Sequence, residues 1–134
     1  MALIVPSVET SGSFTGTLTG FASGPTGTVN YHKIGSRVTL YLTAQISGTS
    51  NATTLTMTGL PAAVRPVNAI SVMVTSVLDT GTPNFGNADI ASAGSTITFA
   101  VPNGTKGNTS TSGFTNSGTK GLTATWQMTY DVES

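Results

Sequence analysis

Apolar and hydroxyl-bearing side chains alternate with a period of two in several stretches of this sequence. In residues 122–132, Leu, Ala, Trp, Met, Tyr and Val alternate with Thr, Gln and Asp, and residues 38–46 show the same pattern. Successive side chains of a β-strand point to opposite faces of the sheet. Both stretches are therefore predicted strands with one face in a core and one Thr-rich face in solvent.

Shorter stretches follow the same pattern. We predict further strands at residues 14–21, 28–34, 53–58, 69–78, 88–91 and 96–101. Gly35-Ser36 suits a two-residue type II′ hairpin turn, whereas Pro61 and Pro66 mark a crossover loop with room for one helical turn. The sequence thus predicts an all-β fold, an antiparallel sandwich or jelly roll of about eight strands.

The chain is long enough for one domain. Of its 134 residues, 1–12 read as an extended arm without periodicity, and 13–134 as a single β-sandwich domain. Residues 102–121 consist almost entirely of Gly, Ser, Thr, Asn and Lys. A loop of that length in a compact domain is either functional or mobile.

Composition excludes several classes of protein. Charged residues make up 7% of the chain, with five Lys and Arg against five Asp and Glu, and Cys is absent. A phosphate-binding basic surface and a disulfide scaffold are therefore not expected. The N-terminus lacks the charged and apolar regions of a secretory signal, and no run approaches the ~20 apolar residues of a membrane span. We expect no nucleic acid, no membrane insertion and no Sec export.

Three sequence features could carry chemistry. Residues 113–120 (GFTNSGTK) nearly match a phosphate-binding loop, but the last two residues are inverted and a strand follows, which favours a Gly-rich turn ending in a surface Lys120. His32, the single His, lacks a nucleophile elbow, which favours a solvated strand residue over a hydrolase centre. Asp79 and Asp89, with the Asn residues between them, could hold Ca²⁺, although turn chemistry is the favoured explanation. We predict no catalytic residue, no metal and no cofactor.

The aromatic residues divide into two groups. Trp126 lies on the inward-alternating face and is predicted to be in the core. Phe85 and Phe114 are lone aromatics in polar stretches, either plugs folded onto the core or exposed anchors for a protein or a sugar ring. The predicted surface-recognition residues are Asn84, Phe85, Asn87, Asn108, Phe114 and Asn116.

The predicted strand near residues 70–78 carries apolar side chains on both faces. Ile70, Val72 and Val74 alternate with Met73 and Val77. A strand that is apolar on both sides is buried on both sides, so part of it is expected to face another subunit. Met73 and Val77 are the predicted subunit contacts, and symmetric self-association is the simplest cover.

Several stretches, in the same order, resemble the C-terminal domains of tailed-bacteriophage fibre proteins. They are GTLTGF (16–21), GTVNYHKIGSRVTL (27–40), LTMTGLP (55–61) followed by Arg65-Pro66, and FTNSGTKG (114–121), and together the similarity spans about residues 13 to 132. The resemblance implies a non-enzymatic, homotrimeric β-sandwich on a virion surface, made in the host cytoplasm, that attaches to a host glycan or protein or decorates the head.

The short segment before this domain refines the expectation. Only a dozen residues precede it, which favours a small separate protein: a capsid decoration, a head fibre or a detachable fibre tip. The arm would then dock on a capsid or tail protein through Leu3, Ile4 and Val5 by adding a strand. The alternatives are a monomeric carbohydrate-binding module or lectin-like domain and, more remotely, a hydrolase that uses His32.

Overall fold

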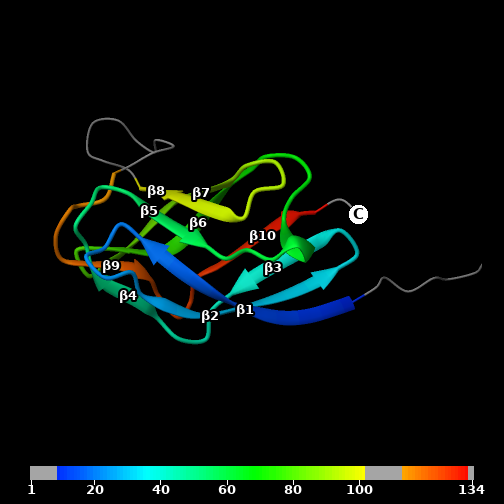
Figure 1. Cartoon of the computed structure of the whole chain (residues 1–134), viewed down its shortest axis with the longest axis horizontal. Helices are drawn as coiled ribbons and strands as arrows, with labels where there is room; N and C mark the ends of the chain where they lie inside the picture. The colour runs from blue at the N-terminus through cyan, green and yellow to red at the C-terminus, as the bar shows by residue number, and fades with distance from the viewer. Residues whose placement is uncertain (1–8, 102–112, 133–134) are drawn as a thin grey trace, which may run out of the picture.

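The computed structural model describes residues 9–101 and 113–132, which form an all-β fold with a single short 3-10 helix (Figure 1). The helix η1 (Ala62–Val64) lies in the predicted crossover loop. The strands are β1 (Glu9–Thr19), β2 (Thr26–Ile34), β3 (Arg37–Tyr41), β4 (Ile46–Thr49), β5 (Leu55–Thr58), β6 (Ile70–Asp79), β7 (Thr82–Ile90), β8 (Thr96–Ala100), β9 (Thr119–Leu122) and β10 (Gln127–Asp131).

All ten strands belong to one antiparallel sheet, in the order β10-β3-β2-β1-β5-β8-β7-β6-β9-β4. The sheet curls on itself, because β10 lies against β6 although six strands separate the two in the sheet. The predicted all-β class and antiparallel pairing are confirmed. The structure differs from the expectation in having ten strands in one continuous sheet.

The core fills the inside of the curl. Phe99 of β8 meets Trp126, which precedes β10, edge to face with ring centroids 5.9 Å apart. Leu18, Val29 and Leu40 from β1, β2 and β3 are also fully buried. The predicted core position of Trp126 is confirmed. Burying aliphatic and aromatic side chains from both ends of the sheet stabilises the curl at about 25 cal/mol per Å² of apolar surface.

Two long predicted strands are each broken in the structure. Residues 122–132 contain the end of β9, a turn in which the Trp126 amide donates to the Thr123 carbonyl, and then β10. Residues 38–46 likewise divide between β3 and the start of β4. Both bends leave the core, since Ala44 and Ala124, which the alternation predicts to face inward, are exposed. Apolar residues nevertheless recur at every second position of the sequence through both bends. The pattern alone therefore cannot show that the chain has changed its pairing partner.

The first strand of the sheet, β1, begins earlier than predicted, and the β6–β7 hairpin is longer than predicted. Glu9–Gly12, assigned to the arm, pair with β2 from Ile34 to Tyr31. β7 occupies most of the segment between the predicted strands 69–78 and 88–91, so that Asp79 pairs with Thr82 across a tight turn. Leu3, Ile4 and Val5 lie outside the described residues. Asn, Pro and Gly in β7 mimic loop composition, but pairing with both β6 and β8 keeps this segment extended.

A β-bulge in β6 corrects the predicted subunit contacts. The register shifts between Val74 and Val77, and Ser76 takes a positive φ of 66°. The extra residue turns Val77 into the core, where it is 0% exposed, so Val77 cannot contact another subunit in the folded chain. Met73, before the bulge, remains outward and 72% exposed. Bulges reorient side chains in this way because they interrupt the period of two.

The predicted turn at Gly35 is also present. Gly35 joins β2 to β3 with φ +60°, and Ser36 does not take a positive φ. A type II′ turn requires this combination, a positive φ at its first central residue alone. Among the described residues, no helix has the length and apolar character needed to cross a bilayer.

Candidate functional site

The outer surface of four neighbouring strands is lined with threonine. Thr17 pairs with Thr26 of β2 and Thr58 of β5, and Thr58 pairs in turn with Thr96 of β8. A second row joins Thr19, Thr56 and Thr98. We call this surface the hydroxyl face, and it consists of Thr15, Thr17, Thr19, Thr26, Thr28, Thr56, Thr58, Thr96 and Thr98.

Cross-strand neighbours on one face have Cβ atoms about 4.5–5.5 Å apart, within reach of each other's hydroxyls. The Thr19 and Thr56 hydroxyls are hydrogen-bonded, and the Thr58 hydroxyl donates to the Thr17 carbonyl. The hydroxyl face is thus a partly ordered array of donors and acceptors that carries no charge.

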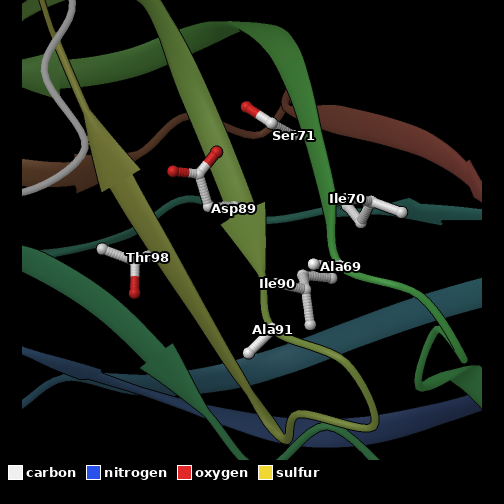
Figure 2. Close-up of a pocket in the computed structure, with 7 residues that line it drawn as sticks. All are labelled: Ala69, Ile70, Ser71, Asp89, Ile90, Ala91 and Thr98. Carbon is white, nitrogen blue, oxygen red and sulfur yellow. The ribbon is translucent and has the colours of Figure 1, made fainter.

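The second threonine row continues across β7 and β6 into a cleft. Thr98 pairs with Asp89, and Asp89 pairs with Ser71. Figure 2 shows these three side chains on adjacent strands, with aliphatic side chains beside them. The cleft has a volume of about 440 Å³ and is lined by Ala69, Ile70, Ser71, Asp89, Ile90, Ala91 and Thr98. That volume lies within the range of ligand pockets, roughly 300–1,000 Å³.

Asp89 gives this cleft its chemical character. Its Oδ1 atom is buried and, within the described residues, has no hydrogen-bond partner. A buried polar atom without a partner loses the free energy of its hydrogen bonds to water, about 1–3 kcal/mol and more for a charged group. Asp89 therefore has an unsatisfied acceptor that a ligand with hydroxyl or N–H donors can satisfy once the carboxyl group turns toward the cleft.

Charged residues gather at the other end of the outer surface, on β1, β2, β3 and β10. His32 Nε2 lies 2.7 Å from Glu9 Oε1, and Arg37 Nε donates to Asp131 Oδ1 at 3.2 Å. His32, Ile34, Arg37 and Thr39 line a hollow of about 450 Å³. An exposed ion pair such as Arg37–Asp131 contributes about 0–1 kcal/mol. His32 is paired with a carboxylate rather than with a hydroxyl, so the contact does not form the nucleophile–base pair of a hydrolase.

Lys120 occupies a cage of backbone carbonyls. Its side chain is 0% exposed, and Nζ donates to the carbonyl oxygens of Gly20 at 2.8 Å, Ala52 at 3.0 Å and Thr54 at 2.5 Å. Three acceptors satisfy the three donors of an ammonium group. The predicted surface position of Lys120 is therefore wrong. Its amine joins three segments of the chain and does not face a phosphate.

Two aromatic rings complete the cage. Lys120 Nζ lies 4.8 Å from the ring centroid of Phe21 and 5.7 Å from that of Phe114, both within cation–π range. Burial lowers the pKa of Lys120 to about 8, and the charge of Asp79 opposes this shift. Phe114 is buried, so the structure corrects its use as an exposed recognition residue. Of the two interpretations that the sequence left open, Phe114 fits the plug.

Phe85 lies at the surface and is 54% exposed. It points outward from β7 two residues before Asn87, which pairs with Met73 of β6. Diagonal neighbours on one face of a sheet are about 7–8 Å apart, so Phe85 and Met73 can touch. We call these two residues the Met73–Phe85 patch. It lies on the β6–β7 hairpin, beside the Asp89 cleft.

The remaining predicted recognition residues that the structure describes lie on the β6–β7 hairpin and in the segment before β9. Asn84 Nδ2 donates to the Thr82 carbonyl in the hairpin turn, and Asn116 is exposed after Phe114. Asn108 lies outside the described residues. Thr115, which precedes Asn116, donates to Asp79 beside the turn that holds Asn84, whereas Asn87 pairs with Met73 farther along the hairpin.

Asp79 and Asp89 lie too far apart along the β6–β7 hairpin to bind one Ca²⁺ ion together. Asp79 pairs with Thr82 beside the turn, whereas Asp89 pairs with Ser71 near the start of β6. Asp79 instead accepts hydrogen bonds from the amide and hydroxyl of Thr115. In the described segments, no three His, Cys, Asp or Glu side chains gather as metal ligands.

The Asp89 cleft was missed from the sequence. Its three polar residues come from three strands, and their alignment depends on a register that the sequence does not reveal. A visible signal was the Thr-x-Thr pattern at residues 15–19, 26–28, 56–58 and 96–98, which marks strands that share one hydroxyl-bearing face.

Comparison of this chain with protein-family models and with curated proteins found no match.

Proposed function

We propose that this chain is a non-enzymatic structural protein displayed on the surface of a tailed-phage virion, as a capsid decoration, head fibre or fibre tip, and that it adheres to the host surface. The proposal is based mainly on the ordered resemblance of about residues 13 to 132 to phage fibre domains. Under this proposal it is made in the host cytoplasm and needs no cofactor.

The outer surface supports an adhesive role. Nine threonines form the hydroxyl face, and only 7% of the whole chain is charged. Hydroxyls exchange hydrogen bonds with neutral partners without the desolvation cost of burying charges. Such a surface suits a glycan or a polar protein of a host cell.

Trimeric assembly would multiply weak contacts. The Met73–Phe85 patch places two large apolar side chains at the surface of one hairpin, where they would gain most from burial against another copy. We propose that it contributes to the homotrimer interface, and that Leu3, Ile4 and Val5 dock on a capsid or tail protein. Three linked copies can bind a host surface far more tightly than one.

Display on a particle can be tested directly. We expect gold-labelled antibodies against the recombinant chain to mark the outside of intact virions that carry it, at the head or at the fibre tip. The proposal would be overturned if the antibodies labelled only disrupted particles, or if they labelled no particles.

A second candidate function is a monomeric carbohydrate-binding module or lectin-like domain. The Asp89 cleft favours it, because a carboxylate beside hydroxyls and aliphatic side chains is suited to a sugar. The two candidates differ in assembly: the second predicts a monomer and no virion partner.

A further inference from the structure

We propose that the cleft between β6, β7 and β8 is a binding site for a neutral sugar residue, and that Asp89 accepts hydrogen bonds from two of its hydroxyl groups. This inference rests on the proposed adhesive role and identifies where on the chain adhesion takes place. Ser71 and Thr98 flank Asp89, one on each neighbouring strand (Figure 2).

The carboxylate is the first argument. Asp89 lines the cleft, and its Oδ1 atom is buried without a hydrogen bond from the described chain, so a rotation of the carboxyl group must bring it to the ligand. Ionised carboxylates accept but do not donate, so the ligand must supply the donors. Hydrogen bonds to a charged acceptor are roughly twice as strong as neutral ones. Adjacent hydroxyls of a sugar ring are donors that one carboxylate can accept together.

The second argument is the arrangement around Asp89. Serine and threonine hydroxyls both donate and accept, so Ser71 and Thr98 can pair with sugar hydroxyls in either direction. Ala69, Ile70 and Ala91 provide small aliphatic surfaces against which the C–H groups of a sugar ring can pack. A volume of about 440 Å³ accommodates one or two sugar residues.

The third argument excludes other ligands. A divalent cation needs several oxygen ligands at once, and Asp89 is the single carboxylate among the described residues that line the cleft. An ammonium ligand would gain from aromatic faces, but none of the cleft-lining residues in the described part of the chain is aromatic. Asp89, flanked by Ser71 and Thr98, therefore matches a neutral polyhydroxyl ligand best.

Affinity for one sugar will be weak. One charge-assisted contact and a few neutral ones on a small ligand correspond to a Kd of about 1 mM. A trimer displaying three clefts would convert this into useful adhesion. The measurement therefore has to detect millimolar binding to a single chain.

The test is a two-dimensional ¹H–¹⁵N NMR titration of the full chain with glucose, galactose, mannose and N-acetylglucosamine. We expect at least one sugar to give saturable shifts of the Ser71, Asp89 and Thr98 amides. Asp89→Asn keeps the volume but removes the charge, and should raise the Kd about tenfold or more. Asp131→Asn, the same change at the other end of the outer surface, should leave the Kd unchanged.

A second variant guards against a folding defect in Asp89→Asn. Ala91 is exposed at the rim, so Ala91→Phe should fill the cleft without disturbing the core and should abolish the shifts. The proposal is overturned if none of the four sugars shifts these amides, if Ala91→Phe binds as well as the unmodified chain, or if ethanolamine shifts them and no sugar does.

This test is independent of assembly and of display. Saturable shifts at the cleft in a chain that is monomeric, or absent from virions, would uphold the sugar site while rejecting the virion role. A trimer that is displayed on virions but shows no such shifts would uphold the virion role and reject the sugar site.

Discussion

Lys120 shows how a chain with few charges uses one of them inside the fold. Its ammonium group connects the segments that contain Gly20, Ala52 and Thr54 through three hydrogen bonds. Ser50 adds to the same region, since its hydroxyl contacts the carbonyls of Ala52 and Thr115. Lys120 and Ser50 therefore hold together three parts of the chain: the segment after β1, the segment after β4 and the loop before β9.

Replacing Lys120 should destabilise the protein strongly. Lys120→Met fills a similar volume but leaves three buried carbonyls without their donor, which we expect to cost about 2–4 kcal/mol in the free energy of unfolding. Lys33→Met is the matched control, because Lys33 has a single long contact, 3.4 Å, to the Ala63 carbonyl. Urea denaturation measures both. Equal losses in the two variants would contradict the role given to the cage.

The lowered pKa of Lys120 also predicts a pH dependence. The folded protein releases the Lys120 proton near pH 8, whereas the unfolded chain keeps it until about pH 10.5. Above pH 8 the unfolded state therefore binds more protons, and stability rises with pH. The neutral amine still donates two hydrogen bonds, so the cage survives deprotonation.

The window for this measurement closes near pH 10. Burial raises the pKa of Tyr130, whose hydroxyl donates to the Val64 carbonyl, so above its ordinary value of 10.0 Tyr130 lowers stability as pH rises. Between pH 8 and 10 we expect the free energy of unfolding of the unmodified chain to increase, and that of Lys120→Met to show a smaller increase or none. Parallel pH profiles in urea denaturation would contradict the assignment.

At the scale of the element, alternation predicted where strands lie, but not where they end or which strands they join. Trp126 illustrates the limit: its inward position followed from the period of two, but the turn before it did not. The bulge at Ser76 was likewise not predicted. A strict period of two assigns Val74 and Val77 to opposite faces, whereas the bulge turns both of them into the core. Register depends on contacts between distant segments, and these placed Asp89 between Ser71 and Thr98.

Close backbone approaches hold the strand ends in place. Gly121 of β9 has φ +152°, and a Cβ built on it would lie 2.1 Å from the Ile46 carbonyl oxygen of β4. Gly81 also has a positive φ, +78°, but faces open space. Gly121→Ala must therefore displace the neighbouring strand, whereas Gly81→Ala pays only for its backbone conformation.

We expect Gly81→Ala to lower the free energy of unfolding by about 1 kcal/mol and Gly121→Ala by more than about 2 kcal/mol. Urea denaturation of the two variants, which carry the same chemical change, measures the difference. Similar losses would mean that the β4–β9 pairing tolerates a shift of the backbone.

At the scale of the whole molecule, the curled sheet separates a packed inside from a hydroxyl-rich outside. The outer side of the β6–β7 hairpin carries both the Asp89 cleft and the Met73–Phe85 patch. This arrangement would place the sugar site close to the subunit interface in the proposed trimer, so that assembly could bring three clefts together.

Met73→Asp tests the proposed interface. Met73 is outward, so an aspartate should leave the thermal midpoint of an isolated subunit nearly unchanged but disrupt a contact between subunits. Gln127→Asp, an exposed position on β10 with the same added charge, should leave assembly intact. Sedimentation velocity compares the variants. Identical sedimentation of both variants and the unmodified chain would remove the patch from the interface.

The most direct test of the account is the mass of the unmodified chain in solution. Size-exclusion chromatography with light scattering, at micromolar concentration, should give three times the 13.5 kDa of one chain. A single species at 13.5 kDa would contradict the trimeric virion protein proposed here and favour the monomeric carbohydrate-binding domain.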